Sequence, residues 1–208
     1  MQAISIIMSA PSGTGKSTIS KQLRLELPNL KFSISHTTRP VRPKEQDGID
    51  YFFVSKNEFE QKIDNKEFLE WANVHGNYYG TTLDSVRKIQ NMGNHIVIEL
   101  DVQGANILRK INFEGVFIMI LPPSFEELRK RLKKRSTESD EKIQKRLEVG
   151  KKEITHYPSY DYVVTNDDVK KSVQTILNII KAEEQRSYRY TPTAKDIVEA
   201  LQIKKDPN

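Results

Sequence analysis

The chain has no cysteine, a single tryptophan and no apolar run long enough to cross a membrane. Without cysteine it can form neither disulfides nor thiolate metal sites, and a reducing cytoplasm is the expected compartment. A membrane span needs roughly 20 consecutive apolar residues, so we expect no membrane partner. The first residues lack the basic segment of a secretory signal, and we expect no such signal either.

The residues that are present are typical of a soluble globular protein, since 37% of the 208 are hydrophobic and 29% are charged. This length allows one core with inserted segments. Lysine and arginine exceed aspartate and glutamate by 33 to 28, which gives a formal net charge of +5. A positive excess favours anionic ligands, and either phosphate compounds or nucleic acid would satisfy it.

A glycine-bearing loop follows the first apolar run, at residues 4–8. Its residues are Ala10, Pro11, Ser12, Gly13, Thr14, Gly15, Lys16, Ser17 and Thr18. Between a strand and a helix such a loop binds a nucleoside triphosphate: backbone N–H groups hold the β-phosphate, Lys16 reaches the β- and γ-phosphates, and the Ser17 hydroxyl ligates Mg²⁺. Ala10 replaces the usual glycine, but alanine fits the extended conformation that precedes a proline. The alternative is a glycine turn with an incidental lysine.

Alternating strand and helix patterns predict an α/β fold with a parallel sheet covered on both faces. Buried strands are expected at residues 4–8, 32–35, 96–101, 116–121 and 162–165. Helical periodicity follows the loop from Ile19 and returns at residues 83–89, 105–111, 128–132 and 169–180. Ser124, after two prolines, is expected to cap a helix.

Two segments do not fit this alternation and look like excursions from one core. Residues 36–82 cluster proline, glycine, tyrosine and arginine and contain a hairpin-like segment at 76–80. Residues 125–155 are almost all charged, with a weak apolar stripe through Ile143 and Leu147. The core is therefore expected from residues 1–35, 83–124 and 156–208. An apolar patch at 197–203 either docks as a last helix or frays.

Further motifs run in one order along roughly residues 3–187. They are Ser35-His-Thr-Thr-Arg39-Pro-Val-Arg42-Pro, Asp47-Gly-Ile-Asp-Tyr51, Glu67-Phe-Leu-Glu70-Trp-Ala, Gly76-Asn-Tyr-Tyr-Gly-Thr81, Asp101-Val-Gln-Gly104, Leu121-Pro-Pro-Ser, Arg131-Leu…Arg135, Lys145-Arg146-Leu and Asn166-Asp-Asp. With the glycine-bearing loop they make the chain resemble guanylate kinase of the bacterial type. Ala10, Pro40-Val41 and Ser136 depart from the family pattern, but none of them removes a functional group.

The resemblance implies a P-loop nucleoside monophosphate kinase fold with a five-stranded parallel core. In that fold residues 36–82 would be a GMP-binding subdomain and residues 125–155 a helical lid. The implied reaction is ATP + GMP giving ADP + GDP with Mg²⁺, in purine nucleotide metabolism. The substrates ATP and GMP are then the expected partners, nucleic acid is not, and the oligomeric state stays open.

The acceptor side of this reaction needs a site for a phosphate dianion. Arg39 and Arg42 lie in a proline-flanked extended segment, and guanidinium groups bind phosphate oxygens bidentately. The resemblance adds the hydroxyls of Tyr51 and Tyr79. The alternative is that the arginines form surface ion pairs and the tyrosines fill a small core.

The base is expected to be recognised by Glu70, because a carboxylate accepts hydrogen bonds from both N1–H and N2–H₂ of guanine but faces a lone pair on adenine N1. From its type alone, without the Glu-Trp-Ala context, a solvated helix residue is the favoured interpretation of Glu70. The GMP-binding set that the resemblance implies is Ser35, Arg39, Arg42, Tyr51, Glu70, Tyr79, Gly80, Thr81 and Asp101.

On the donor side, Glu99 and Asp101 alternate at the carboxyl end of a strand, where ligands bind in α/β sheets. A carboxylate there can hold Mg²⁺ waters, and we expect Asp101 with Ser17 in that role. Glu99 could instead be an edge residue that faces solvent.

A dense basic run at residues 129–135 places Arg131 and Arg135 on one helix face. The resemblance implies that they act with Arg146 and Lys16 as catalytic residues, and that Asn166 contacts ATP. A basic run alone is more often a solvated face or a nucleic-acid patch. No general base is required, because the attacking oxygen of GMP is already an anion, and the scattered histidines are expected to be structural or exposed.

Two other functions stay open at this point. A scaffold domain of the same family would use the acceptor site to bind phosphopeptides, although the donor loop is intact. A basic nucleic-acid-binding NTPase would need a recognition helix or an aromatic RNA-binding pattern, and neither is present in the sequence.

Overall fold

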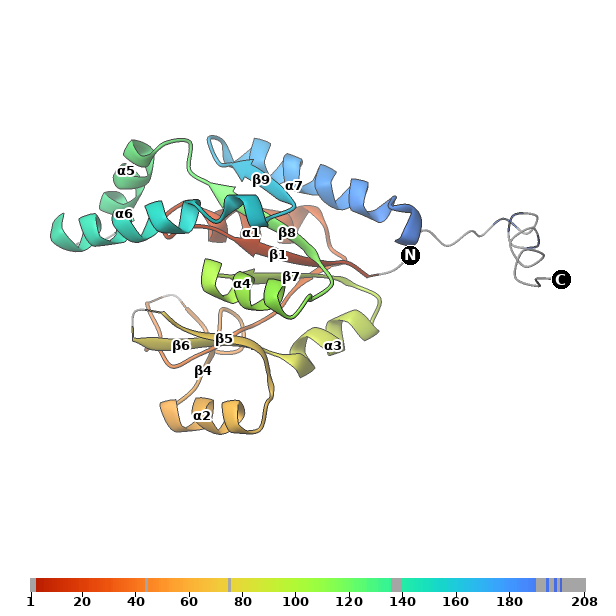
Figure 1. Cartoon of the computed structure of the whole chain (residues 1–208), viewed down its shortest axis with the longest axis horizontal. Coiled ribbons are helices and arrows are strands. Elements are labelled where there is room, and N and C mark those ends of the chain that lie inside the picture. The colour runs from red at the N-terminus through yellow and green to blue at the C-terminus, as the bar shows by residue number, and fades with distance from the viewer. Residues whose placement is uncertain are drawn as a thin grey trace.

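The computed structural model describes residues 3–43, 45–74, 76–135, 140–189, 194, 197 and 199, and of Arg135 it describes the backbone. The main sheet has five strands in the order β2-β7-β1-β8-β9 (Figure 1). They are β1 (Ser5–Ser9), β2 (Leu30–Phe32), β7 (His95–Leu100), β8 (Val116–Leu121) and β9 (Tyr162–Thr165). Every pair in this order is parallel, which confirms the predicted core.

The strand β2 lies earlier than predicted, so the placement at residues 32–35 was wrong. Leu30 and Phe32 are buried and Lys31 is exposed, which is the alternation of an edge strand packed on one face. The Ser33 amide still donates to the Val97 carbonyl at 2.9 Å. Beyond it the chain leaves the main sheet and enters the second one.

Helices cover both faces of the main sheet (Figure 1). These helices are α1 (Lys16–Glu26), α3 (Leu83–Asn91), α4 (Val102–Lys110) and α7 (Val169–Glu184). Ile6 and Met8 of β1 belong to the core on the α1 and α7 face, and Ile7 belongs to the core on the α3 and α4 face. Because successive side chains of a strand point to opposite faces, one apolar strand supplies both cores.

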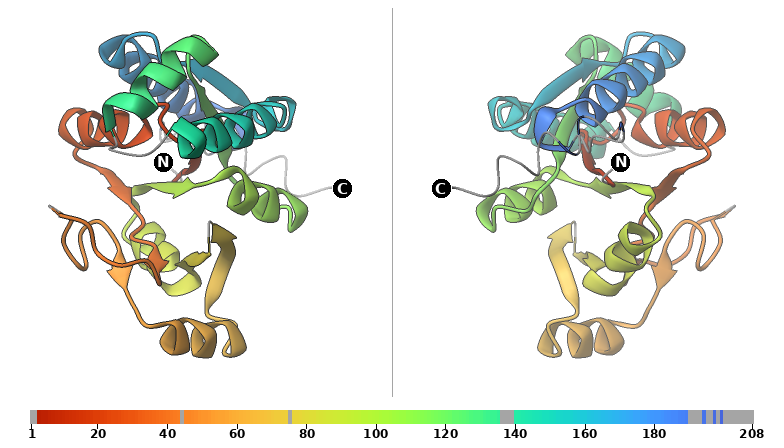
Figure 2. Two further views of the ribbon diagram at one scale, coloured as in Figure 1. Left: turned by 90° about the vertical axis from the view of Figure 1, so that its left-hand side faces the viewer. Right: turned by 90° about the vertical axis from the view of Figure 1, so that its right-hand side faces the viewer.

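A second sheet of four strands lies beyond α4, in the order β4-β3-β6-β5 (Figure 2). Its strands are β3 (His36–Thr37), β4 (Phe52–Phe53), β5 (Phe68–Val74) and β6 (Asn77–Thr82). β5 and β6 form an antiparallel hairpin, as the segment at 76–80 predicts. The helix α2 (Lys56–Asp64) starts at a capping box of Ser55 and Glu58. Its Phe59 stacks on Phe68 and Tyr78, with centroids 4.3 and 5.3 Å away.

The helices α5 (Phe125–Arg135) and α6 (Asp140–Ile154) pack on each other beside the start of α1 (Figure 2). They share a small core of Leu128, Leu132, Ile143 and Leu147. The Glu127 amide donates to the Ser124 hydroxyl at 3.0 Å, so the predicted cap is confirmed. Ser136 lies outside the described residues.

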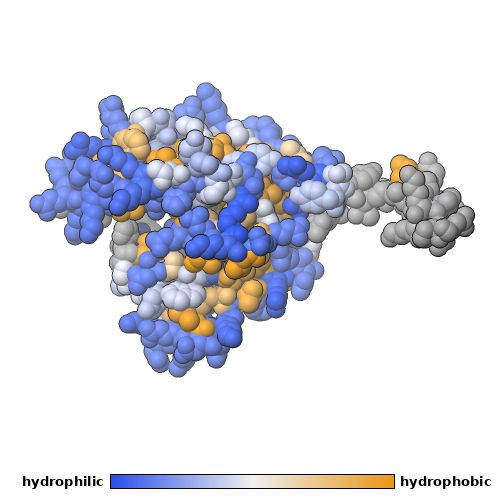
Figure 3. Space-filling view, viewed as in Figure 1, coloured by the Kyte–Doolittle hydropathy of each residue, from blue (hydrophilic) through white to orange (hydrophobic). Residues whose placement is uncertain are grey.

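Two short 3₁₀ turns, at Tyr157–Ser159 and Ser187–Arg189, flank β9 and α7. No helix among the described residues is both long and apolar enough to cross a membrane. Hydrophilic residues cover much of the face in Figure 3, most densely over α5 and α6. Most of the apolar patch predicted at 197–203 lies outside the described residues, and Ile197 is exposed.

Candidate active site

The loop between β1 and α1 turns on two glycines. Gly13 has φ +91° and Gly15 has φ +110°, a region that side chains rarely adopt. A Cβ on Gly13 would lie 2.7 Å from Leu132, and one on Gly15 would lie 2.5 Å from the amide nitrogen of Asn166. Glycine is therefore required at both positions by conformation and by space. With this loop leading into α1, an incidental glycine turn does not account for the segment.

Lys16 extends from the first turn of α1 toward the carboxyl end of β7. Its Nζ donates to the Leu100 carbonyl oxygen at 3.0 Å. In open α/β sheets, ligands bind at this end of the strands. Lys16 is thereby held where the loop and the second sheet face each other.

One cavity opens between the carboxyl end of β7 and the second sheet, with about 540 Å³ of empty space including its mouth. The predicted residues that line it are Lys16, Ser35, Tyr51, Glu70, Tyr79, Gly80 and Asp101. Residues from both predicted half-sites thus face the same space.

Glu70 lies on β5 and is only 5% exposed, so the alternative of a solvated helix position was wrong. Its Oε1 accepts the Thr81 N–H at 3.0 Å, and the Thr81 and Ser35 hydroxyls lie 3.1 Å apart. Burial, with a smaller contribution from the charge of Asp101, raises the pKa of Glu70 to about 7. A buried carboxylate of this kind gains strongly from a ligand that donates two hydrogen bonds.

The position of Glu70 depends on an irregularity in the hairpin and on a glycine opposite. The β5–β6 register shifts between Phe68 and Glu70, so that Glu70 pairs with Thr81. On the side of α4, a Cβ on Gly104 would lie 2.7 Å from Glu70 Oε2. Gly104 therefore leaves room for the carboxylate.

Asp101 precedes α4 and has one oxygen engaged. Its Oδ1 accepts the Gly104 N–H at 2.8 Å, while Oδ2 is buried without a hydrogen-bond partner in the described part of the chain. Glu99 is half-buried in the cavity and accepts the Ser20 hydroxyl at 2.7 Å. The alternative that Glu99 is an edge residue facing solvent was wrong, because β7 lies between β2 and β1.

These residues fit a magnesium ion that is bound mainly through phosphates. No group of three or more His, Cys, Asp or Glu side chains among the described residues could hold a metal ion by itself. Mg²⁺ usually keeps several waters and takes one or two carboxylates plus substrate phosphates. The unpartnered Asp101 Oδ2 and the exposed Ser17 fit that kind of site.

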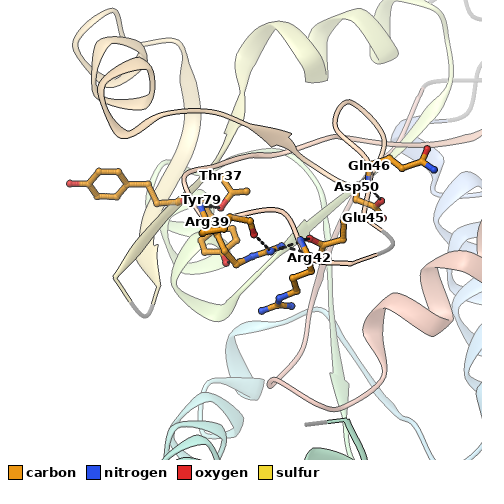
Figure 4. A network of polar contacts seen from close by, with 9 residues as sticks. Thr37, Arg39, Arg42, Glu45, Gln46, Asp50 and Tyr79 are labelled. Atoms are coloured by element: carbon orange, nitrogen blue, oxygen red, sulfur yellow. Dashed lines mark hydrogen bonds and ion pairs between the residues drawn. The ribbon is translucent and has the colours of Figure 1, made fainter. Parts of the chain in front are cut away.

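The predicted phosphate-binding arginines differ sharply in their surroundings (Figure 4). Arg39 is buried and forms a two-point ion pair with Glu45, both N···O distances being 3.0 Å, while its Nε donates to the Tyr79 hydroxyl at 3.2 Å. Arg42 is exposed, and its guanidinium extends away from Glu45. Burial raises the pKa of Tyr51 to about 12, so its hydroxyl stays a donor.

The arginines of α5 and α6 contact the glycine-bearing loop. Arg131 donates to the Thr14 carbonyl at 2.9 Å, to the Asn166 carbonyl at 3.0 Å and to Glu127 at 2.8 Å. From α6, Arg146 donates to the Ser12 hydroxyl at 2.6 Å. The side chain of Arg135 lies outside the described residues. A freely solvated basic face is therefore not what Arg131 and Arg146 form.

Asn166 is 2% exposed, and both ends of its amide are engaged within the protein. Its nitrogen donates to the Thr14 carbonyl at 2.8 Å, and its oxygen accepts the Ser172 hydroxyl at 3.2 Å. In this arrangement Asn166 supports the loop backbone.

Comparison with known proteins agrees with these features. The guanylate kinase family model matches residues 2–183. The guanylate kinase of Caldanaerobacter subterraneus subsp. tengcongensis is 50% identical over 185 residues, covering 89% of this chain and 90% of that protein. That of Desulfitobacterium hafniense is 44% identical over 184 residues, covering 88% and 92%. The crystal structure of guanylate kinase from Anaplasma phagocytophilum matches with a TM-score of 0.75 at 33% identity, covering 90% and 89%.

The chain belongs to the guanylate kinase family. This confirms the resemblance read from the motifs, the P-loop α/β fold and the class of a nucleotide-binding kinase, hence a transferase. The individual roles of the site residues stay predictions.

Sequence reasoning overlooked three residues beside the candidate site. Glu45 pairs with Arg39, and its place three residues after Arg42 was the available signal. Gly104 belongs to the Asp101-Val-Gln-Gly104 motif, but the sequence did not indicate why that position is glycine. Glu153 of α6 has a buried oxygen, Oε2, with no partner in the described part of the chain. Burial, and then the charge of Asp101, raises the pKa of Glu153 to about 7.

His36 and His95 serve the fold. His36 stacks near Phe52 with ring centroids 4.9 Å apart, and its burial lowers its pKa. His95 accepts the Ile4 N–H at 3.1 Å and contacts Glu184 at 2.8 Å. His75 lies outside the described residues. Neither His36 nor His95 lines the cavity.

Proposed function

We propose that this chain transfers the γ-phosphoryl group of ATP to GMP and releases ADP and GDP. The observation that carries the proposal is the cavity that Lys16 of the glycine-bearing loop shares with Glu70 and Tyr79 of the second sheet. A donor and an acceptor nucleotide that meet there need no covalent intermediate. Phosphoryl transfer depends on alignment and on neutralisation of charge, and both are supported by this juxtaposition.

On the donor side, the N–H groups of the loop and the start of α1 receive the β-phosphate, and Lys16 reaches the transferred group. Ser17 and Asp101 are the residues that would hold Mg²⁺, which would supply neutralising charge at the phosphates. Arg131, Arg135 and Arg146 stabilise the charge of the transferring group. The contacts of Arg131 with Thr14 and of Arg146 with Ser12 support this role.

On the acceptor side, Glu70 accepts the N1–H and N2–H₂ donors of guanine, and Ser35 and Thr81 add hydroxyls beside it. Adenine would turn the N1 lone pair toward the buried carboxylate, at a cost of roughly 2–5 kcal/mol. Arg39, Arg42, Tyr51 and Tyr79 bind the GMP phosphate, and Gly80 lines the cavity next to Tyr79. A phosphate oxygen of GMP attacks the γ-phosphorus directly as an anion, so no side chain has to remove a proton.

Residues 36–82 then act as the GMP-binding subdomain and residues 125–155 as a lid, both attached to the core of residues 1–35, 83–124 and 156–208. Their closure would exclude water, which otherwise competes for the γ-phosphoryl group. Cytoplasmic location and the absence of a nucleic-acid partner stay predictions from the sequence.

A coupled assay of the purified protein with ATP, Mg²⁺ and GMP, AMP, CMP, UMP or dTMP tests the proposal. We expect turnover with GMP that exceeds turnover with AMP by at least about thirtyfold, given the cost above. Equal turnover of AMP would overturn the guanine assignment. Binding of GMP without turnover would favour a non-catalytic scaffold, and tight oligonucleotide binding that is lost with salt would favour a nucleic-acid partner.

A further inference from the structure

Glu45 is an acidic residue in a site that is expected to bind an anion. Its carboxylate lies between the two arginines that are expected to bind the phosphate dianion. Its oxygens accept from Nη1 and Nη2 of Arg39, each at 3.0 Å. Oε2 also accepts the Arg42 backbone N–H at 2.9 Å, and the Glu45 N–H donates back to the Arg42 carbonyl at 3.0 Å. One side chain therefore fixes a guanidinium and a backbone turn together (Figure 4).

The contacts of Arg39 leave it little freedom to grip a ligand. A guanidinium has five N–H donors. Four of those of Arg39 are engaged: Nε with the Tyr79 hydroxyl, Nη1 with the Pro40 carbonyl and Glu45, and Nη2 with Glu45. Its Cζ also lies 5.5 Å from the ring centroid of Tyr51. Arg39 thus brings a fixed positive charge and one remaining N–H.

The guanidinium of Arg42 is in the opposite state. It is exposed and has no hydrogen bond or ion pair to the described part of the protein, and its planar fork is available for a two-point contact with phosphate. Its backbone, however, is held by Glu45 from both sides. The guanidinium of Arg42 is therefore available to a ligand, while the backbone of Arg42 is held in place by Glu45.

The electrostatics of Glu45 agree with a permanent ionised partner. Although burial alone would raise it, the hydrogen bonds from Arg39 and from the Arg42 amide lower the pKa of Glu45 below its usual range. Although burial alone would lower it, the pairing with Glu45 and Tyr79 raises the pKa of Arg39. The carboxylate keeps its charge at neutral pH beside the place where a phosphate dianion would bind.

We propose that Glu45 is a positioning residue for the acceptor phosphate: it holds Arg39 as a fixed charge and anchors the turn from which Arg42 supplies the two-point contact. This inference rests on the proposed use of GMP. The negative charge of Glu45 by itself disfavours binding of a phosphate dianion, since a carboxylate repels it. Glu45 therefore acts through geometry and against the local charge.

The test compares Glu45→Gln with Asp50→Asn in the full chain. Asp50 is a matched control, because its carboxylate lies in the same loop and accepts the Gln46 N–H at 2.9 Å but does not contact Arg39. In Glu45→Gln we expect KM for GMP to rise about tenfold, with kcat and KM for ATP unchanged, because misplaced binding groups weaken ground state and transition state alike. Asp50→Asn should leave all three constants within about twofold of wild type. Glu45→Asp, which keeps the charge but shortens the reach, should lie between the two.

Calorimetry with guanosine separates positioning from a general loss of structure, because guanosine lacks the phosphate. Its affinity should be the same in wild type and Glu45→Gln. The inference is overturned if KM for GMP is unchanged or falls in Glu45→Gln, as simple removal of a repelling charge predicts. It is also overturned if guanosine binding weakens in parallel, or if Asp50→Asn shows the same loss. Absence of GMP turnover in the wild type would instead overturn the proposed function itself, and the inference with it.

Discussion

The donor and acceptor sides of the cavity are built from similar residue types but in different ways. On the donor side, Arg131 and Arg146 reach the loop through neutral oxygens, namely the Thr14 carbonyl and the Ser12 hydroxyl, and the pairing of Arg131 with Glu127 is a single contact on the surface of α5. On the acceptor side, Arg39 contacts the carboxylate of Glu45. The base site adds another carboxylate, Glu70, which is buried beside the Thr81 amide.

The donor side is formed mainly by one continuous stretch of chain, whereas the acceptor side is assembled from several separate segments. The donor loop takes its shape from its own glycines, with α5, α6 and Asn166 packed against it. The acceptor site combines side chains from two strands of the second sheet, β5 and β6, with residues of the segments around β3 and β4. Neutral contacts can be exchanged for phosphate oxygens at little cost, whereas paired charges must be arranged in advance. The two sides should therefore respond differently to substitution.

The largest effect is expected from Lys16→Ala on the donor side. Loss of a preorganised positive group at the transferring phosphoryl lowers kcat by about 10²–10³-fold, or about 3–4 kcal/mol in the barrier. Guanosine or GMP binding measured by calorimetry should be retained, because Lys16 donates to the Leu100 carbonyl and acts on Glu70 only through its charge. Lys21→Ala, an exposed position on the same helix, is the control and should be silent. Loss of GMP binding in Lys16→Ala would show that the two sides are not separable.

The next effect is expected from Glu70→Gln on the acceptor side. The amide offers guanine one acceptor and one clashing donor, so kcat/KM for GMP should fall by roughly a hundredfold, or about 3 kcal/mol. ATP binding should be unaffected. Asp64→Asn, at an exposed position of α2, is the control within the same subdomain. An unchanged preference for GMP over AMP would mean that another group reads the base.

A smaller effect is expected from pH. The pKa of Glu70 is raised to about 7, and guanine needs the ionised form, so guanosine affinity should be constant above pH 7 and fall about tenfold per unit below it. Glu70→Gln should abolish this slope. Guanosine is used because it has no phosphate that titrates. A flat profile for the wild type would contradict the assignment.

The same shift makes a prediction for stability. Between pH 4.5, the ordinary pKa, and about 7, the folded protein holds a proton on Glu70 that the unfolded chain has lost. Unfolding therefore releases this proton, and the contribution of Glu70 to the free energy of unfolding falls as pH rises through that window. Denaturant titration of wild type against Glu70→Gln measures the difference.

The smallest effect is expected from Gly104→Ala. A new Cβ would lie 2.7 Å from Glu70 Oε2, so KM for GMP should rise severalfold although alanine favours the helix by about 0.5–1 kcal/mol. Gly150→Ala is the matched helical control, because its Cβ would meet nothing closer than 3.4 Å. Equal KM values in both variants would show that the carboxylate adjusts freely.

Sequence reasoning did well where a function depends on neighbouring residues. The glycines of the donor loop and the strand and helix at its two ends are local features, and the five parallel strands followed from continuous apolar runs. It did less well where the chain passes from one sheet to the other. A strand was predicted at residues 32–35, but β2 ends at Phe32, because the chain then leaves the main sheet for the second one. Glu70 could be singled out from its motif, but its burial on a strand could not.

By itself, the order of residues determined that a triphosphate loop opens this chain, that parallel strands form its centre, and which family it resembles, because backbone conformation and hydrophobic periodicity act over a few residues. Only the tertiary structure decided which charges meet. The partnership of Glu45 with Arg39 and the burial of Glu70 beneath Gly104 arise from strand register and helix placement, since the free energy of a charge depends on what surrounds it in space.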